Sequence, residues 1–148
     1  MPTAQEQLDG FLDRFSPDIA AHARAVLDLV RPFVPGAVEL VYDNYHALVV
    51  SFGPTARAAD AVLSVAVYPN WVTLFFMRGV DLDDPFHQLH GTGSTVRGVR
   101  IKSLAQFEEE RFQMLIETAV AMAAKPIDGT VERTLIIKSI SAKQRPRR

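Results

Sequence analysis

The sequence predicts a two-layer α+β protein, in which an antiparallel sheet of about five to six strands packs against N-terminal and C-terminal helices. Three observations favour this fold class. Strand-like runs follow one another in the middle of the chain, helical periodicity precedes and follows them, and 148 residues suffice for one hydrophobic core. The composition, 48% apolar and 22% charged, is typical of a globular protein.

The apolar stretch AVLSVAVYPNWVTLFFM is the centre of the predicted sheet. It contains two strands, Val62–Tyr68 and Trp71–Met77, joined at Pro69-Asn70. Successive side chains of a strand point to opposite faces, so one face of this pair is wholly apolar and the other nearly so. The wholly apolar face comprises Ala61, Leu63, Val65, Val67, Val72, Leu74 and Phe76. We expect the rest of the chain to pack around this hairpin.

Apolar residues at helical spacing predict three helices. Thr3–Phe15 forms the first, and a second begins after Ser16 and ends at Pro32–Pro35. Ser16 is a suitable cap, and Pro17 suits the first helical position. The third helix, Leu104–Ala124, follows the strands.

Further strands complete the predicted sheet. Val38–Tyr42 and His46–Phe52 form a second hairpin, Thr95–Ile101 follows a long loop, and Thr134–Ile140 adds a strand at an edge. We therefore expect a single α+β domain over residues 1–141. The basic C-terminal segment, residues 142–148, is expected to be an unpaired and mobile tail.

Composition narrows the function classes. The chain has no cysteine, which excludes disulfides, thiolate metal sites and cysteine catalysis. It shows no secretory signal and no apolar run long enough to span a bilayer, so we expect a cytoplasmic protein with no membrane partner. The net charge of −1 divides into +5 over residues 131–148 and −6 over the remaining 130 residues.

A loop rich in Asp and His is the predicted metal site. Carboxylates and imidazoles within ten residues can bind iron, manganese or zinc. The candidate ligands are Asp81, Asp83, Asp84, His87 and His90. Their spacing matches no established motif, and acidic loop residues more commonly serve solvation and turn formation. If metal binds here, we expect weak, exchangeable binding.

The glycine-rich segment after this loop is the predicted anion site. Backbone N–H groups and arginines there can bind a phosphate or carboxylate, although the segment is neither a P-loop nor a dinucleotide fingerprint. The candidate residues are Gly91, Gly93, Ser94, Arg97 and Arg100. The alternative is a simple glycine turn that enters a strand.

Arg97 needs a partner in either case. Strand alternation places it on the apolar face with Val99, where an unpaired charge would cost several kcal/mol. A carboxylate, a cluster of carbonyl groups or a ligand would satisfy it. Glu39 and Asp81 are candidate internal partners, and a bulge at Gly98 would instead turn the side chain outward.

Two further sets of residues are candidates for binding. A basic tail can bind the phosphates of nucleic acid or the acidic groups of a partner. The basic residues of this tail are Lys143, Arg145, Arg147 and Arg148. No aromatic residue lies between them for base stacking, and a solvated tail is the simpler interpretation. Aromatic and imidazole side chains near strand ends could line a pocket: Tyr42, Tyr45, His46 and Trp71.

The segment GVDLDDPFHQLHGTGSTVRGVRI resembles the signature region of the YdhG-like bacterial proteins, whose function is mostly unassigned. The match comprises Gly79, Leu82, Asp84-Pro85, Gly91, Gly93, Arg97 and Arg100. The resemblance extends from about Phe11 to Ala124 and implies a small two-layer α/β domain, with at least one relative described as a frataxin-like iron chaperone. The chain departs from the family pattern at Ser94, where lysine is common, and at Gly98, where histidine is expected.

These observations favour a protein that binds rather than transforms its partner. No nucleophile elbow, metalloprotease pair or pair of catalytic carboxylates is apparent. The leading hypothesis is a weak metal-binding or iron-chaperone-like module. The alternatives are an adaptor that binds protein or nucleic acid through its tail and an enzyme for a small anionic substrate near Arg97 and Arg100. An exposed apolar sheet face would favour a homodimer.

Overall fold

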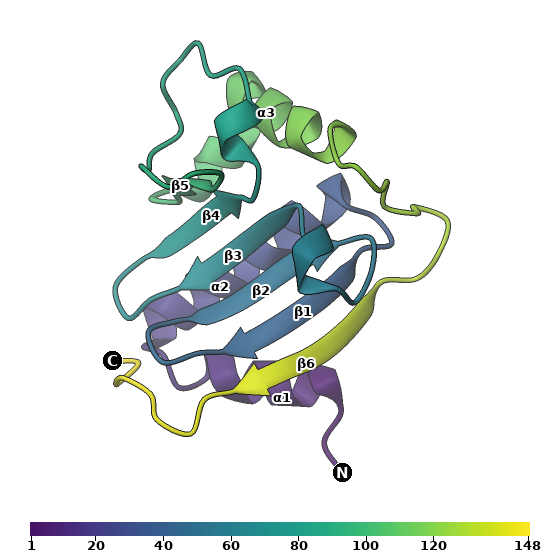
Figure 1. Cartoon of the computed structure of the whole chain (residues 1–148). Coiled ribbons are helices and arrows are strands. Elements are labelled where there is room, and N and C mark those ends of the chain that lie inside the picture. Colours follow the sequence, from purple (N-terminus) through teal and green to yellow (C-terminus); the bar gives the residue numbers. More distant parts are fainter.

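A computed structural model describes residues 1–148 and contains a single open sheet of six strands, in the order β5-β4-β3-β2-β1-β6. The strands are β1 (Val38–Asp43), β2 (Leu48–Gly53), β3 (Leu63–Val67), β4 (Val72–Phe76), β5 (Arg97–Arg100) and β6 (Thr134–Ile140). Neighbouring strands are antiparallel except β1 and β6, which are parallel. The α+β fold class with two layers is confirmed, as is the central hairpin, which forms β3 and β4 (Figure 1).

The parallel β6 is the one departure from the expected antiparallel sheet. The connection that follows the last helix passes beside the turn before β1, where Asp128 lies against Gly36. The chain therefore enters β6 at the same end of the sheet as β1, and Thr134 pairs with Val38. Local sequence patterns cannot predict the direction of β6, because it depends on where the preceding helix ends in space.

The chain has three α-helices: α1 (Ala4–Leu12) and α2 (Pro17–Val30) pack against the sheet, and α3 (Glu110–Ala121) adds side chains to the same core. Figure 1 shows α1 and α2 behind the sheet and α3 beyond its β4–β5 end. The Ser16 hydroxyl accepts a hydrogen bond from the N–H of Ile19 and caps α2, as predicted. The third helix begins later than predicted because Ser103 caps a separate 3₁₀ turn, η4 (Leu104–Glu108), and Glu109 is extended before α3.

The core lies between the helices and one face of the sheet. A row of directly paired residues crosses five strands on that face and is buried throughout: Val41, Val50, Val65, Leu74 and Val99. Helix α2 packs the apolar stripe Ala23, Val26, Leu27 and Val30 into the same core. Each large apolar side chain buried in this way contributes roughly 1.5–3 kcal/mol. None of the helices combines the length and apolar content that a membrane-spanning helix needs.

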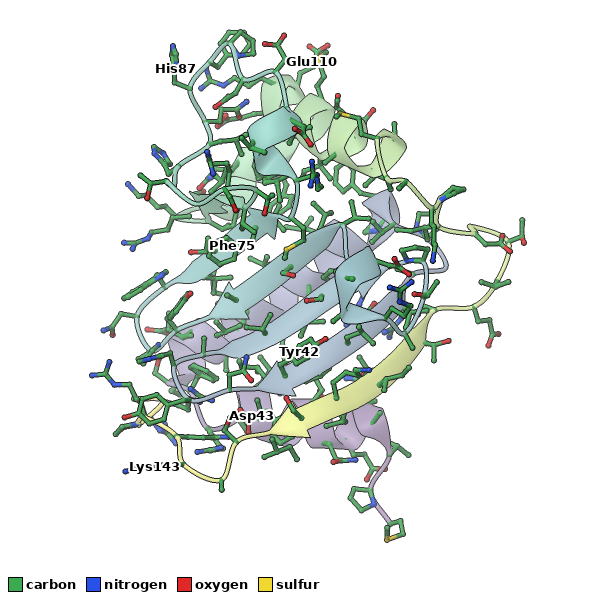
Figure 2. All side chains as sticks on the ribbon, viewed as in Figure 1. Tyr42, Asp43, Phe75, His87, Glu110 and Lys143 are labelled. Atoms are coloured by element: carbon green, nitrogen blue, oxygen red, sulfur yellow. The ribbon has the colours of Figure 1, made fainter.

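The opposite face of the sheet has no α-helix over it, and Figure 2 shows Tyr42 and Phe75 on this open face. A second row of directly paired residues crosses the same five strands there: Tyr42, Val49, Ala66, Thr73 and Arg100. The row begins at an aromatic side chain and ends at a cation on the edge strand β5. This face presents the surface from which the candidate site is built.

The C-terminal segment is paired, which corrects the expected unpaired tail. The backbone N–H of Ser141 donates to the carbonyl of Asp43, and that of Arg145 donates to the carbonyl of Tyr45. Arg147 is buried against the end of the β1–β2 hairpin. The segment thus folds back against the hairpin, where Arg147 joins Arg14 in neutralising the buried carboxylate of Asp43.

Candidate functional site

The five residues of the predicted metal site do not converge. They lie in the loop between β4 and β5, and no three His, Asp or Glu side chains of the chain lie close enough to hold a metal ion. Asp83, His87 and His90 are exposed, and His87 points away from the molecule in Figure 2. The metal hypothesis therefore rests on the sequence pattern alone.

Two of the predicted metal ligands have structural partners. Asp81 accepts a hydrogen bond from the guanidinium of Arg78 at 2.7 Å. Asp84 accepts backbone N–H groups from Gln88 at 2.9 Å and from Leu89 at 2.8 Å. These contacts close a turn in the loop, which is the role that acidic loop residues commonly have.

Arg97 satisfies its charge on backbone carbonyl groups, one of the three kinds of partner that the sequence left open. Its Nη1 donates to the carbonyl of Gly93 at 2.6 Å and to that of Val96 at 2.8 Å. Neither Glu39 nor Asp81 is its partner, and β4 and β5 pair without a bulge. Arg97 therefore holds the glycine-rich loop in place.

The basic residues of the C-terminal segment differ in exposure. Lys143, Arg145 and Arg148 are exposed, and Lys143 points outward in Figure 2. Arg147 is buried and donates to Asp43 at 2.9 Å. Three of the four cations are thus at the surface, while the fourth neutralises a buried carboxylate.

The predicted aromatic pocket is divided between separate parts of the surface. Tyr42 lines a groove on the open face. His46 and Trp71 line a different, shallow cavity of about 390 Å³ at the hairpin ends. The ring of Tyr45 packs edge-on against His46, with ring centroids 4.7 Å apart.

An open cleft of about 740 Å³ lies at the β5 edge, and Gly91 and Arg100 of the predicted anion site line it. Gly93, Ser94 and Arg97 do not. The cleft is also lined by further side chains that can donate hydrogen bonds: Gln88, His90, Lys102, Gln106 and Arg111. We call this feature the cationic cleft.

Three elements position the cations of the cleft. Arg100 ends β5, Lys102 follows it at the same sheet edge, and Arg111 lies in the first turn of α3. The backbone of His90 exchanges two hydrogen bonds of 2.9 Å with Gly98, which fixes the loop that forms one wall. The guanidinium of Arg100 lies 4.5 Å from the centroid of the Trp71 ring, and this stacking restricts its orientation.

The charges of the cleft are incompletely neutralised. Glu109 is the only carboxylate in its lining, and it is bonded to Arg111 at 3.4 Å. Arg100 and Lys102 have no carboxylate within 4.0 Å. The chain therefore presents a local excess of positive charge in a body that is otherwise acidic.

A smaller cavity of about 190 Å³ lies between the β3–β4 strands and the end of α3, and it has no unpaired cation in its lining. Its cations are already paired, Arg78 with Asp81 and Lys125 with Asp60. The hydroxyl of Thr55, together with Lys125, holds the pKa of Asp60 below its ordinary value of 3.8, although burial opposes this shift. These pairs leave no cation free for a ligand, which favours the cationic cleft as the candidate site.

Sequence reasoning missed Lys102, Arg111 and the two glutamines of the cleft. Lys102 follows Arg100 at a spacing of two, the strand period, and this spacing was a usable signal. Arg111 carried no such signal, because its place in the cleft depends on how α3 packs against the edge of the sheet.

The fold and the cleft define a small α+β protein with a cationic cleft at one edge of its sheet. Comparison of the chain with protein-family models, with curated protein sequences and with solved structures gives no match. The resemblance to the YdhG-like proteins therefore stays a prediction.

Proposed function

We propose that this chain is a binding protein whose cationic cleft takes a small organic anion, with a carboxylate or phosphate as the bound group. The observation that carries the proposal is that Arg100 and Lys102 line one cleft without a carboxylate partner. By contrast, the two buried acids Glu39 and Asp43 each have two arginine partners: Arg31 and Arg133 for Glu39, and Arg14 and Arg147 for Asp43.

The two cations suit different parts of the recognition. An arginine presents a planar fork that binds carboxylate or phosphate through two parallel hydrogen bonds, whereas a lysine supplies a compact charge. The ring of Trp71 beneath Arg100 limits the orientations of the fork before a ligand arrives. Such restriction reduces the entropy lost on binding and favours affinity.

Titration with acetate and with inorganic phosphate, followed by chemical-shift changes of the backbone amides, tests the proposal. We expect saturable changes at Arg100, Lys102 and Arg111 in the millimolar range. Arg100→Ala should weaken binding roughly 10- to 100-fold, since hydrogen bonds to charged groups contribute about 1.5–3 kcal/mol. Lys143→Ala, which removes an exposed cation at the other end of the sheet, is the matched control and should leave affinity unchanged.

Two results would contradict the proposal. One is the absence of saturable changes with either anion in the wild-type chain. The other is equal loss of affinity in Arg100→Ala and Lys143→Ala, which would indicate general charge attraction without a defined site.

A further inference from the structure

A groove on the open face adjoins the cationic cleft. The groove has a volume of about 420 Å³, and Phe75 lines both the groove and the cationic cleft. Its wall residues include Tyr42, Tyr68 and Met77. A volume of this size falls within the range of small-molecule sites, which are mostly apolar with a few polar groups.

Small side chains on the central strands make the floor of the groove. Ser51, Ser64 and Ala66 are only 7%, 4% and 1% exposed, although no α-helix covers this face. The floor is hidden because larger side chains rise around it. The space of the groove therefore lies between these larger side chains, above a floor that they almost cover.

The polar atoms of the floor are already satisfied. The hydroxyls of Ser51 and Ser64 share a hydrogen bond of 2.7 Å, and the hydroxyl of Ser64 also donates to the sulfur of Met77 at 3.3 Å. The phenol of Tyr68 at the wall is uncharged near neutral pH, and burial raises its pKa further above the ordinary value of 10.0. The groove therefore favours an uncharged hydrocarbon group.

Two structural features connect the groove with the cationic cleft. The paired row on the open face runs from Ala66 through Thr73 to Arg100. Beside this row, the ring of Tyr68 stacks on that of Trp71 with centroids 4.8 Å apart, and the guanidinium of Arg100 lies over the Trp71 ring. A floor of small side chains and an aromatic wall thus both lead to Arg100.

We infer that the ligand is a free amphipathic anion: its carboxylate or phosphate binds at Arg100, and its hydrocarbon part lies across Thr73 and Ala66 in the groove. This inference rests on the proposed function of the cleft. Two strand spacings separate Arg100 from Ala66, about 10 Å, so the hydrocarbon must be of medium length. The positive charge at one end and the apolar trough at the other match the two ends of such a molecule.

A series of linear carboxylates tests the inference. Acetate, butanoate, hexanoate and octanoate are titrated into the wild-type chain, with octanol as the uncharged probe. Each methylene that enters the groove should strengthen binding about fourfold, from the usual gain on burying a methylene. Octanol should bind much more weakly than octanoate because it lacks the anion.

A groove variant separates this inference from the proposed function. Ala66→Leu extends a side chain into the groove and should remove the dependence on chain length while acetate binding remains. Arg100→Ala should weaken every carboxylate in the series. Acetate binding without chain-length dependence in the wild type would overturn the inference and leave the proposed function standing, whereas loss of all binding would overturn both.

A direct measurement does not depend on the stability of the variant. In the wild-type complex with octanoate, nuclear Overhauser contacts are expected between the terminal methyl of the ligand and the methyl of Ala66. Contacts from that terminal methyl to residues outside the groove, with none to Ala66, would overturn the inference. So would octanol binding as tightly as octanoate, because the groove would then act independently of the cleft.

Discussion

Arg147 and Asp43 form an ion pair of 2.9 Å in which each side chain is only 2% exposed. The same guanidinium donates to the carbonyl of Asn44 at 2.6 Å, and its carbon lies 5.6 Å from the centroid of the Phe15 ring. Gln144 adds a hydrogen bond of 2.8 Å to the other carboxylate oxygen. The end of the chain is therefore part of the folded core of the hairpin region.

Replacement of Arg147 by alanine should destabilise the protein. The substitution leaves the buried carboxylate of Asp43 with the half-exposed Arg14 at 3.4 Å as its remaining cation. We expect the free energy of unfolding to fall by about 3 kcal/mol, at the lower end of the range for breaking a buried ion pair. Urea unfolding measures the change. Arg148→Ala, at an exposed neighbour, should change it by less than about 0.5 kcal/mol, and equal effects of the two would contradict the pairing.

Asp60 should contribute to the loss of stability in acid. Its pKa is lowered, first by the hydrogen bond of 2.6 Å from Thr55 and then by Lys125. A lowered carboxyl pKa gives stability that is present above the ordinary value of 3.8 and is lost as pH falls below it. Between pH 5 and pH 3, Asp60→Asn should therefore lose less stability than the wild type.

Urea midpoints measured at several pH values check this expectation. Asp83→Asn provides the control, because Asp83 is exposed and makes no hydrogen bond or ion pair to another side chain. Its midpoint should follow that of the wild type with pH. If the urea midpoint of Asp60→Asn falls between pH 5 and pH 3 as steeply as that of the wild type, Asp60 makes no such contribution.

Gly36 should not tolerate a side chain. Its φ of +79° is in the region that favours glycine, and a Cβ there would collide with the carbonyl oxygen of Asp128. We expect Gly36→Ala to lower the free energy of unfolding by more than 1 kcal/mol, roughly the threshold for an incompatible backbone position. Gly10→Ala in α1 has open space around it and should raise the free energy by roughly 0.5–1 kcal/mol, because glycine is a poor helix former. Thermal unfolding of both variants distinguishes the two outcomes.

Asp84 should hold its loop closed without a bound metal. Removal of its carboxylate frees the N–H groups of Gln88 and Leu89. Hydrogen bonds to charged groups contribute about 1.5–3 kcal/mol, so exchange of these two amides should quicken roughly tenfold or more in Asp84→Ala. Asp83→Ala is the matched control. If the two amides are protected only after addition of Fe(II), the loop is organised by metal and this structural role is wrong.

Several features of the fold followed from local sequence patterns. The alternation in Val62–Tyr68 and Trp71–Met77 placed Leu63, Val65 and Leu74 on one face, and that face is the core. Ser16 and Pro17 marked the start of α2. These predictions succeeded because side-chain direction and helix capping depend on residues close together in the chain.

The candidate site was predicted only in part. Gly91 and Arg100 were identified and do line the cleft, whereas the neighbouring Arg97 turned to carbonyl groups of its own loop. The pattern showed that Arg97 needed a partner, and it left open which partner. Side-chain alternation gives the face of a residue, while its partner depends on the path of the loop in space.

The sequence alone determined the order of the strands and helices along the chain and which of their faces are apolar, because hydrophobic periodicity and caps act over a few residues. Only the tertiary structure decided that β6 lies parallel to β1, that Arg147 meets a carboxylate 104 residues away, and that Arg111 of α3 joins Arg100 in one cleft. Each of these contacts is between separate segments of the chain, and the order of the strands and the packing of the helices bring them together. Local propensity contains no information about that order, so the site emerged only when the sheet was assembled.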